Sequence, residues 1–249
     1  MFKIYRRFLD GLPEYLARHY WWAYLWRPGI WFFDHQFIIN AILFGQYKKL
    51  MNATLARFKR RPAGRVLQLS CVYGELTSHL LEALAGEQLQ LIDVSDRQLL
   101  NTRNKLGADS TLSLARMDAE CLAYSDNSFS TIVLFFLLHE MPGEARQRVI
   151  SECVRILDDQ GILILTEYGA HPERHYLYRF PIARRMLTRL EPFLESFWRE
   201  DLHDLLKQGA EPGGKTVKIV TQETFFRGFY SVTTYRVREN QKQVSSANS

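Results

Sequence analysis

The feature that most constrains this chain is an alternation of short apolar runs with amphipathic segments, which begins after residue 65. Apolar runs of this length are typical of buried strands, and the segments between them carry apolar residues at helical spacing. The predicted strands are Val66–Cys71, Leu89–Val94, Ser113–Met117, Ser130–Leu138 and Gly161–Glu167. The predicted helices are Leu76–Ala85, Ser95–Lys105 (capped by Ser95) and Gly143–Leu157. Such alternation indicates a parallel sheet covered on both faces, so we predict a doubly wound α/β fold.

The rest of the chain is predicted to frame this domain. The Arg60–Gly64 stretch is a predicted hinge between residues 1–62 and an α/β domain at 63–238. Within that domain we predict a helical insertion at about 173–208, with its helical stretch at Ile182–Lys207. Two β-rich runs follow and predict a C-terminal antiparallel hairpin: Val217–Phe225 and Tyr230–Val237. Residues 239–249 are polar and predict a disordered tail.

Residues 1–62 combine positive charge with aromatic side chains. They hold 11 lysines and arginines against three acids, 16 of the 33 aromatic residues and four of the five tryptophans. A basic surface can bind nucleic acid or an anionic membrane. The tryptophans favour the membrane, because indole rings settle at the lipid headgroups. We therefore predict a membrane-facing helical lid and no nucleic-acid partner. Its predicted helices are Phe2–Arg18, Phe33–Gln46 and Tyr47–Arg60, with a break at Pro28-Gly29.

Two further patterns bear on the environment of the protein. The stretch Ala183–Trp198 has an apolar side and a basic side, which suits a bilayer interface or packing on the protein's own core. No apolar run approaches the roughly 18 residues of a spanning helix, and the start does not resemble a signal peptide. The three cysteines cannot all pair and form no CxxC, so we expect neither a disulfide framework nor a cysteine zinc site.

The candidate chemistry lies where the predicted strands end. The first strand leads into Val72-Tyr73-Gly74-Glu75, the turn at which open α/β sheets bind ligands. Asp93 ends the second strand, where an acid can bind both hydroxyls of a ribose. Asp118 follows the third strand and could meet an adenine edge. His139-Glu140 ends the fourth strand and could supply a base or a metal ligand, although a purely structural histidine is the alternative.

The order of these elements resembles the class I S-adenosylmethionine-dependent methyltransferases, whose sheet is Rossmann-like. In that family the first strand reads acid–x–Gly–x–Gly–x–Gly, whereas Gln68, Ser70, Val72 and Gly74 stand at those positions here. The acid and two of the three glycines are therefore replaced. The resemblance implies S-adenosylmethionine as cofactor and a binding set of Gln68, Ser70, Tyr73, Gly74, Asp93, Val94, Asp118, Ala119 and Leu134.

A narrower resemblance joins that turn to the aromatic N-terminal segment. Tyr15–Tyr24, Phe33-Asp34, Ile42–Gly45 and Val66–Thr77 together resemble the rhodoquinone biosynthesis family RquA, which is similar to the quinone-ring methyltransferases. The resemblance implies conversion of membrane-embedded ubiquinone to rhodoquinone, in which the cofactor donates an amino group in place of a ring methoxy. It also implies a divalent metal (manganese), a peripheral position on the cytoplasmic side of the inner membrane, and a possible quinone-synthesis complex.

Three residues are predicted to be catalytic, namely Gln68, Tyr73 and His139. A carboxylate beside the cofactor ammonium would keep it protonated, and an amine can attack a quinone only when neutral. Gln68 would ease that deprotonation, and Tyr73 would place the quinone ring. Two alternatives stay open: a quinone or lipid C- or O-methyltransferase, and a non-catalytic scaffold. His19, His35 and Asp34 are weaker candidates for contacts in the lid, and the metal ligands are left unknown.

Overall fold

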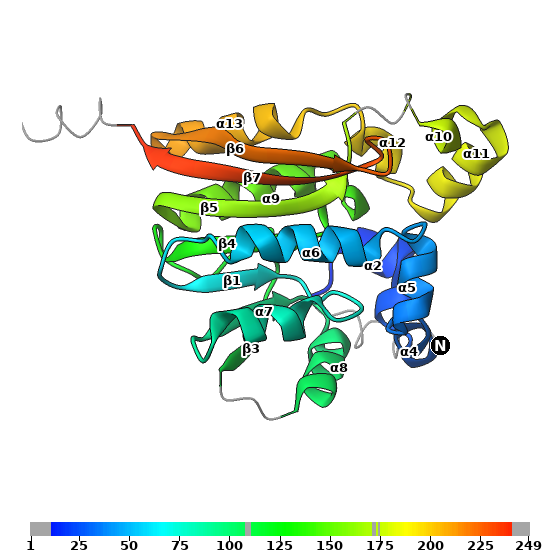
Figure 1. Cartoon of the computed structure of the whole chain (residues 1–249), viewed down its shortest axis with the longest axis horizontal. Helices are drawn as coiled ribbons and strands as arrows, with labels where there is room; N and C mark the ends of the chain where they lie inside the picture. The colour runs from blue at the N-terminus through cyan, green and yellow to red at the C-terminus, as the bar shows by residue number, and fades with distance from the viewer. Residues whose placement is uncertain (1–10, 108–110, 171–172, 174, 241–249) are drawn as a thin grey trace, which may run out of the picture.

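A seven-stranded sheet with strand order β3-β2-β1-β4-β5-β7-β6 forms the centre of the computed structural model (Figure 1). The structure describes residues 11–107, 111–170, 173 and 175–240. The strands are β1 (Val66–Leu69), β2 (Leu89–Asp93), β3 (Leu112–Arg116), β4 (Phe129–Phe135), β5 (Leu157–Tyr168), β6 (Lys215–Phe225) and β7 (Tyr230–Glu239). Strands β1 to β5 are parallel, and β7 is antiparallel to both β5 and β6. The predicted doubly wound sheet and its terminal hairpin are thus confirmed.

The central strands are buried on both faces, as the unbroken apolar runs predict. Every residue of β1 and of β4 is buried. On one side of β1, Val66 pairs with Leu89 of β2, and on the other side it pairs with Thr131 of β4. The chain therefore leaves β1 in one direction for β2 and returns to its other side for β4. This reversal of strand order is the point at which doubly wound sheets bind ligands.

Helices cover both faces of the sheet. One face carries α6 (Tyr47–Phe58) and α7 (Leu76–Leu84), and the opposite face carries α9 (Gly143–Ile156) and α13 (Leu202–Ala210) (Figure 1). A further helix, α8 (Asp96–Leu106), lies beside β2 and β3. The predicted cap of α8 is confirmed, because the Ser95 hydroxyl accepts a hydrogen bond from the Gln98 N–H at 3.4 Å.

The N-terminal segment differs from its predicted helices. It forms α2 (Glu14–His19), α3 (Trp21–Tyr24), α4 (Arg27–Phe33), α5 (Gln36–Ile42) and α6. The predicted break at Pro28-Gly29 is wrong, because both residues lie in the first turn of α4, where a proline needs no N–H donor. Of the predicted helix Phe2–Arg18, residues 2–10 lie outside the described residues, as do residues 241–249 of the predicted tail.

The predicted helical insertion contains several short helices. They are α10 (Tyr176–Arg179), α11 (Pro181–Leu190), α12 (Leu194–Phe197) and α13, followed by the 3₁₀ turn η3 (Glu211–Gly213). Pro192 separates α11 from α12, because the residue before a proline is pushed out of helical geometry. That residue is Glu191, whose backbone has φ −118° and ψ 82°.

Helices α2 to α5 and α10 to α12 gather at one end of the molecule, over the carboxyl ends of the parallel strands (Figure 1). Between β4 and α9 the chain makes a 3₁₀ turn, η1 (Leu138–Glu140), at this same end. Among the described residues, no helix combines the length and apolar character needed to cross a bilayer.

The side chain of Arg146, in α9, holds the η1 turn in place by hydrogen bonds to its backbone carbonyls. Its side chain is fully buried. Its Nε donates to the Leu138 carbonyl at 3.0 Å and its Nη2 to the Met141 carbonyl at 2.8 Å, while its Nη1 pairs with Glu200. One guanidinium therefore binds two carbonyls of the turn and links them to Glu200, which lies just before α13.

We expect Arg146→Met to lower the free energy of unfolding by about 3 kcal/mol, because it leaves Glu200 and the buried Met141 carbonyl without a partner and removes one of the two hydrogen bonds to the Leu138 carbonyl. Arg148→Met is the matched control on the same helix. Its side chain is 54% exposed, so its pair with Glu120 should contribute little to stability. Urea denaturation of both variants provides the measurement, and equal losses would contradict the role given to Arg146.

Candidate functional site

Two cavities meet at the switch point of the sheet, one of about 60 Å³ and one of about 310 Å³. The first lies against the ends of β1, β2 and β3. The second lies under helices α3 to α5 and is lined mainly by apolar and aromatic side chains. Four residues line both cavities: Tyr24, Cys71, Phe136 and Glu140. These side chains form the wall that the cavities share, so the cavity that holds Asp93 and Asp118 lies beside the apolar aromatic cavity.

Five of the predicted cofactor-binding residues line the first cavity together: Ser70, Asp93, Val94, Asp118 and Ala119. The Asp93 carboxylate accepts hydrogen bonds from the Cys71 N–H at 2.8 Å and the Ser95 N–H at 2.7 Å. These bonds hold the carboxylate between the turn after β1 and the turn after β2. Burial raises the pKa of Asp93 to about 6, against the opposing effect of the same hydrogen bonds.

Four predicted cofactor residues do not line the first cavity: Gln68, Tyr73, Gly74 and Leu134. Leu134 is buried within β4. Gly74 has φ +86°, and a Cβ there would collide with the Tyr47 hydroxyl. Gln68 is 1% exposed, its Nε2 donates to the Ser70 carbonyl at 3.1 Å, and its Oε1 is buried with no partner among the described residues. Gln68, which stands where the family has an acid, therefore lies behind the turn after β1, and its Oε1 is a hydrogen-bond acceptor without a partner among the described residues.

Tyr73 lines the second cavity. Its ring stacks on Tyr24, with centroids 5.8 Å apart and planes inclined by 8°. Its hydroxyl donates to the Ala23 carbonyl and accepts from Gln98 Nε2 at 2.7 Å. The single hydroxyl proton is therefore used to hold the N-terminal segment, and the side chain offers the cavity its ring.

The N-terminal segment is fastened over the first cavity by further polar contacts. The Asp34 carboxylate pairs with Lys105 Nζ at 2.7 Å and accepts from the Gly74 N–H at 3.2 Å. Tyr15 donates to Glu120 at 3.1 Å and lines the first cavity. A volume of about 60 Å³ has room for only a few water molecules. A nucleoside therefore requires this segment to move outward. The other two lid candidates, His19 and His35, line neither cavity.

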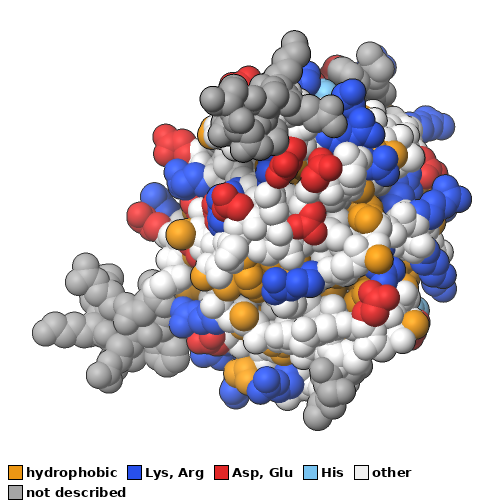
Figure 2. Space-filling view, turned by 90° about the vertical axis from the view of Figure 1, so that its left-hand side faces the viewer, with side chains coloured by type: hydrophobic (Ala, Val, Ile, Leu, Met, Phe, Trp, Pro, Cys, Tyr) orange, Lys and Arg blue, Asp and Glu red, His pale blue; other side chains and the backbone are white. Residues whose placement is uncertain are grey.

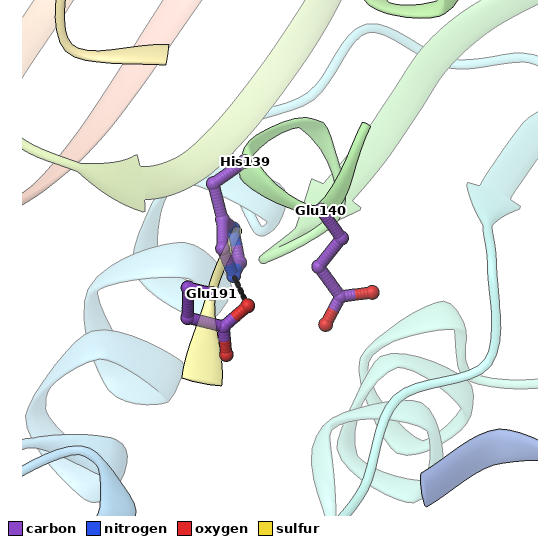
Figure 3. Close-up of side chains that lie close together, drawn as sticks. All are labelled: His139, Glu140 and Glu191. Atoms are coloured by element: carbon purple, nitrogen blue, oxygen red, sulfur yellow. Dashed lines mark ion pairs between the residues drawn. The ribbon is translucent and has the colours of Figure 1, made fainter. Parts of the chain in front are cut away.

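His139, Glu140 and Glu191 gather on the second cavity's wall (Figure 3). The first two come from η1, and Glu191 comes from the break between α11 and α12. His139 Nδ1 lies 2.8 Å from a carboxylate oxygen of Glu167, and its Nε2 lies 3.9 Å from Glu191. Tyr24 donates to Glu140, and Tyr20 donates to Glu191 at 3.0 Å.

Burial dominates the electrostatics of this group. It raises the pKa of Glu140 to about 8 and also raises the pKa of Glu191, while the nearby His139 opposes both shifts. For His139, burial alone would lower the pKa of the imidazole, but the neighbouring carboxylates of Glu167, Glu191 and Glu140 together outweigh it and the pKa rises to about 9.

Sequence reasoning missed Glu167 and Glu191. Glu167 was visible as an acid within an otherwise apolar strand, a pattern that indicates a paired buried carboxylate. Glu191 gave no such signal, because its position depends on how α11 and α12 fold back over η1.

Three comparisons place the chain among known proteins. Residues 66–161 match the sequence profile described as "Methyltransferase domain". The chain is 30% identical over 146 residues to a ubiquinone/menaquinone biosynthesis C-methyltransferase, UbiE, of Pseudoalteromonas translucida, covering 56% of this chain and 57% of that protein. The chain therefore spans somewhat over half the length of this curated relative.

Among solved structures, the N-methyltransferase NodS of Bradyrhizobium japonicum is 15% identical, with a TM-score of 0.52 over 78% of this chain and 99% of that chain. The [4+2]-cyclase SpnF is 18% identical, with a TM-score of 0.52 over 77% of this chain and 80% of that chain. At such identities these likenesses concern the fold alone. The chain therefore has the Rossmann-like class I methyltransferase fold, and its residues 66–161 match a methyltransferase domain.

Proposed function

We propose that this chain transfers a group from S-adenosylmethionine to the ring of a quinone. The observation that carries the proposal is that the cavity holding Asp93 adjoins an apolar aromatic cavity, because Tyr24, Cys71, Phe136 and Glu140 line both. Transfer requires donor and acceptor atoms in van der Waals contact, which two adjoining cavities provide. The cofactor, when bound, supplies the transferred group.

The first cavity suits the nucleoside half of the cofactor. It lies at the carboxyl ends of β1 and β2, on the ligand-binding side of a doubly wound sheet. Asp93 presents a carboxylate that the backbone already orients, which suits the two hydroxyls of a ribose. Asp118 and Ala119 lie on the far side of this cavity, where we infer the adenine.

The second cavity suits a flat, largely apolar ring. Its volume is about 310 Å³, and the stacked rings of Tyr24 and Tyr73 form part of its lining, together with Phe33 and Phe135. Offset stacking between such faces favours an aromatic or quinonoid guest. The name of the Pseudoalteromonas relative, a ubiquinone/menaquinone C-methyltransferase, supports a quinone as that guest.

Methyl transfer to carbon is the reaction that this relative's name supports. Amination is the second candidate. Gln68 would favour it, because no carboxylate stands at this position to hold the cofactor ammonium in its charged form, but the Gln68 side chain lies behind the turn and does not line the first cavity in this structure. A class I fold does not decide between them, since one fold hosts unrelated chemistries. Rhodoquinone as product, manganese and a quinone-synthesis complex stay predictions from the resemblance, as does the inner-membrane position. A non-catalytic scaffold is the remaining alternative.

The mass of the product tests the proposal directly. The full chain is incubated with S-adenosylmethionine, manganese and a short-chain ubiquinone analogue, or its demethylated precursor. A methylated or an aminated quinone supports the proposal, and the two masses separate the two reactions. Recovery of both quinones unchanged, by protein that binds the cofactor in calorimetry, would leave the scaffold and overturn the proposal.

Gln68→Glu tests whether this residue sets the type of reaction. If amination occurs, we expect its rate to fall at least tenfold, because each pKa unit of added ammonium stabilisation costs about 1.4 kcal/mol in exposing the lone pair. Cofactor affinity should hold. Gln222→Glu, on the exposed strand β6, controls for the added charge. An unchanged amination rate in Gln68→Glu would show that the first-strand charge is irrelevant.

Asp93→Asn tests the assignment of the cofactor cavity. We expect cofactor affinity to fall at least tenfold, because charge-assisted hydrogen bonds are worth about 1.5–3 kcal/mol each. The control is Asp96→Asn, an exposed acid three residues away. In the parent, affinity should also decline as the pH falls through about 6, where the raised pKa lets Asp93 protonate. Calorimetry that finds no loss in Asp93→Asn, or an equal loss in Asp96→Asn, would contradict the assignment.

Membrane attachment is proposed through the end of the molecule that covers the site. Large apolar side chains are exposed there on α5 and α11, with Phe37 80% and Ile182 73% exposed. Arg184, Arg185 and Arg189 of α11 add positive charge. After Pro192 the predicted amphipathic stretch turns inward, and Leu194 and Phe197 are buried in the core. The opposite end of the molecule carries interspersed charges of both signs (Figure 2).

We expect the double variant Phe37→Ala, Ile182→Ala to lose most of its cosedimentation with anionic liposomes. Parent binding should weaken as salt rises, since each basic residue near the surface contributes about 1 kcal/mol that salt screens. Ile219→Ala with Val220→Ala, an exposed apolar pair on β6, is the matched control. Equal sedimentation of parent and Phe37/Ile182 variant would place attachment elsewhere.

A further inference from the structure

One imidazole and two carboxylates converge at a single point on the second cavity's wall. They belong to His139, Glu140 and Glu191, and one ligand atom from each lies within 4.8 Å of the other two (Figure 3). His139 and Glu140 are neighbours on η1, whereas Glu191 is about fifty residues further along the chain. The turn after β4 therefore positions His139 and Glu140, and the insertion places Glu191 beside them.

When its carboxylates are ionised, this group carries more negative than positive charge. Glu167 adds a third buried carboxylate behind His139. Within the described part of the chain, His139 is the single cationic group that pairs with any of these three acids. Burying carboxylates without compensating charge is expensive, and proteins meet that cost by pairing them or by binding metal.

His139 Nε2 points into the group without a hydrogen bond. The residue is 4% exposed and lines the second cavity. Its distance of 3.9 Å from Glu191 exceeds hydrogen-bond range. Nδ1 is taken by Glu167, whose other carboxylate oxygen accepts from the Leu137 and Leu138 N–H groups at 2.9 and 2.6 Å. A carboxylate on one ring nitrogen with the other nitrogen free is the usual setting of a metal-binding histidine.

We propose that His139 Nε2, Glu140 and Glu191 bind one divalent cation, with Glu167 as the residue that orients the imidazole. Two carboxylates and one imidazole suit Mn²⁺ and similar ions that accept mixed oxygen and nitrogen ligands. Tyr24 and Tyr20, which donate to Glu140 and Glu191, orient these carboxylates in the same way. When bound, the cation would supply a Lewis acid to oxygen atoms of a guest in the apolar cavity.

The cation site deepens the proposed function, yet its test needs neither cofactor nor quinone. The probe is Mn²⁺ alone, added to the full chain, and free Mn²⁺ is followed by its six-line electron paramagnetic resonance signal. We expect one site per chain. Glu140→Gln and Glu191→Gln should each weaken binding at least tenfold, because each removes one charged ligand. Glu167→Gln should weaken it by about ten- to a hundredfold through the imidazole.

Glu82→Gln is the matched control, because Glu82 also lies 2.9 Å from a histidine, His79, but on the surface of α7. It should bind Mn²⁺ as the parent does. Thermal unfolding gives a second readout that exposes any misfolded variant: Mn²⁺ should raise the Tm of the parent and of Glu82→Gln, and leave that of Glu140→Gln unchanged.

Two results would overturn the cation site. One is a parent chain that leaves the free Mn²⁺ signal undiminished, which would assign the acids to balancing the positive charge of the cofactor. The other is folded Glu140→Gln and Glu191→Gln variants that bind Mn²⁺ as tightly as the parent. Because quinone turnover enters neither readout, failure of the cation site and failure of the proposed function are distinguishable.

Discussion

The buried contact between Glu167 and His139 is the interaction on which the geometry of the site depends. Glu167 is the last residue but one of strand β5. Its carboxylate accepts hydrogen bonds from two backbone N–H groups at the start of the turn after β4, and it also contacts the imidazole of His139. Arg146 holds the carbonyl side of the same turn. Because hydrogen bonds hold both the N–H groups and the carbonyls of this turn, Glu140 is fixed in the lining of the second cavity. A polar network of this kind is stable in the core because each member is paired, and it loses much of its value if one is removed.

The two cavities have different origins in the chain. The first is made largely by the ends of β1 to β3, within the matched methyltransferase domain at residues 66–161. Most of the second is contributed by helices α3 to α5 and by Leu190 and Glu191 of the insertion, which lie outside the matched residues. The common part of the fold thus holds the cofactor side of the proposed reaction. The segments outside residues 66–161 would decide which guest is bound beside the cofactor.

Strand and helix periodicity predicted the sheet well, because buried parallel strands are unbroken apolar runs and their helices carry clear apolar stripes. The same signals placed Ser70, Asp93 and Asp118 at one edge, and the structure gathers them there. The bounds of short helices were harder to predict from the sequence. Pro28 was taken as a break, although it begins α4. Gln68 and Leu134 were taken as cofactor residues from the family resemblance, but both side chains are buried in their strands and do not reach the first cavity.

The site's electrostatic centre could not be predicted, because it depends on the packing of the insertion over η1. Nothing local to Glu191 distinguishes it from a surface acid before a proline. Tyr73 illustrates the same limit in the other direction: its phenol was expected to meet the substrate, but the Ala23 carbonyl of the folded-over N-terminal segment accepts its proton.

The proposed function requires donor and acceptor to be bound in the two adjoining cavities whose linings share Tyr24 and Glu140. A crystal structure of the full chain with S-adenosylhomocysteine and a short-chain quinone tests it most directly. The account predicts the ribose on Asp93 and the quinone ring against the stacked faces of Tyr24 and Tyr73. A quinone bound away from these rings, or an adenosine that does not contact Asp93, would contradict it.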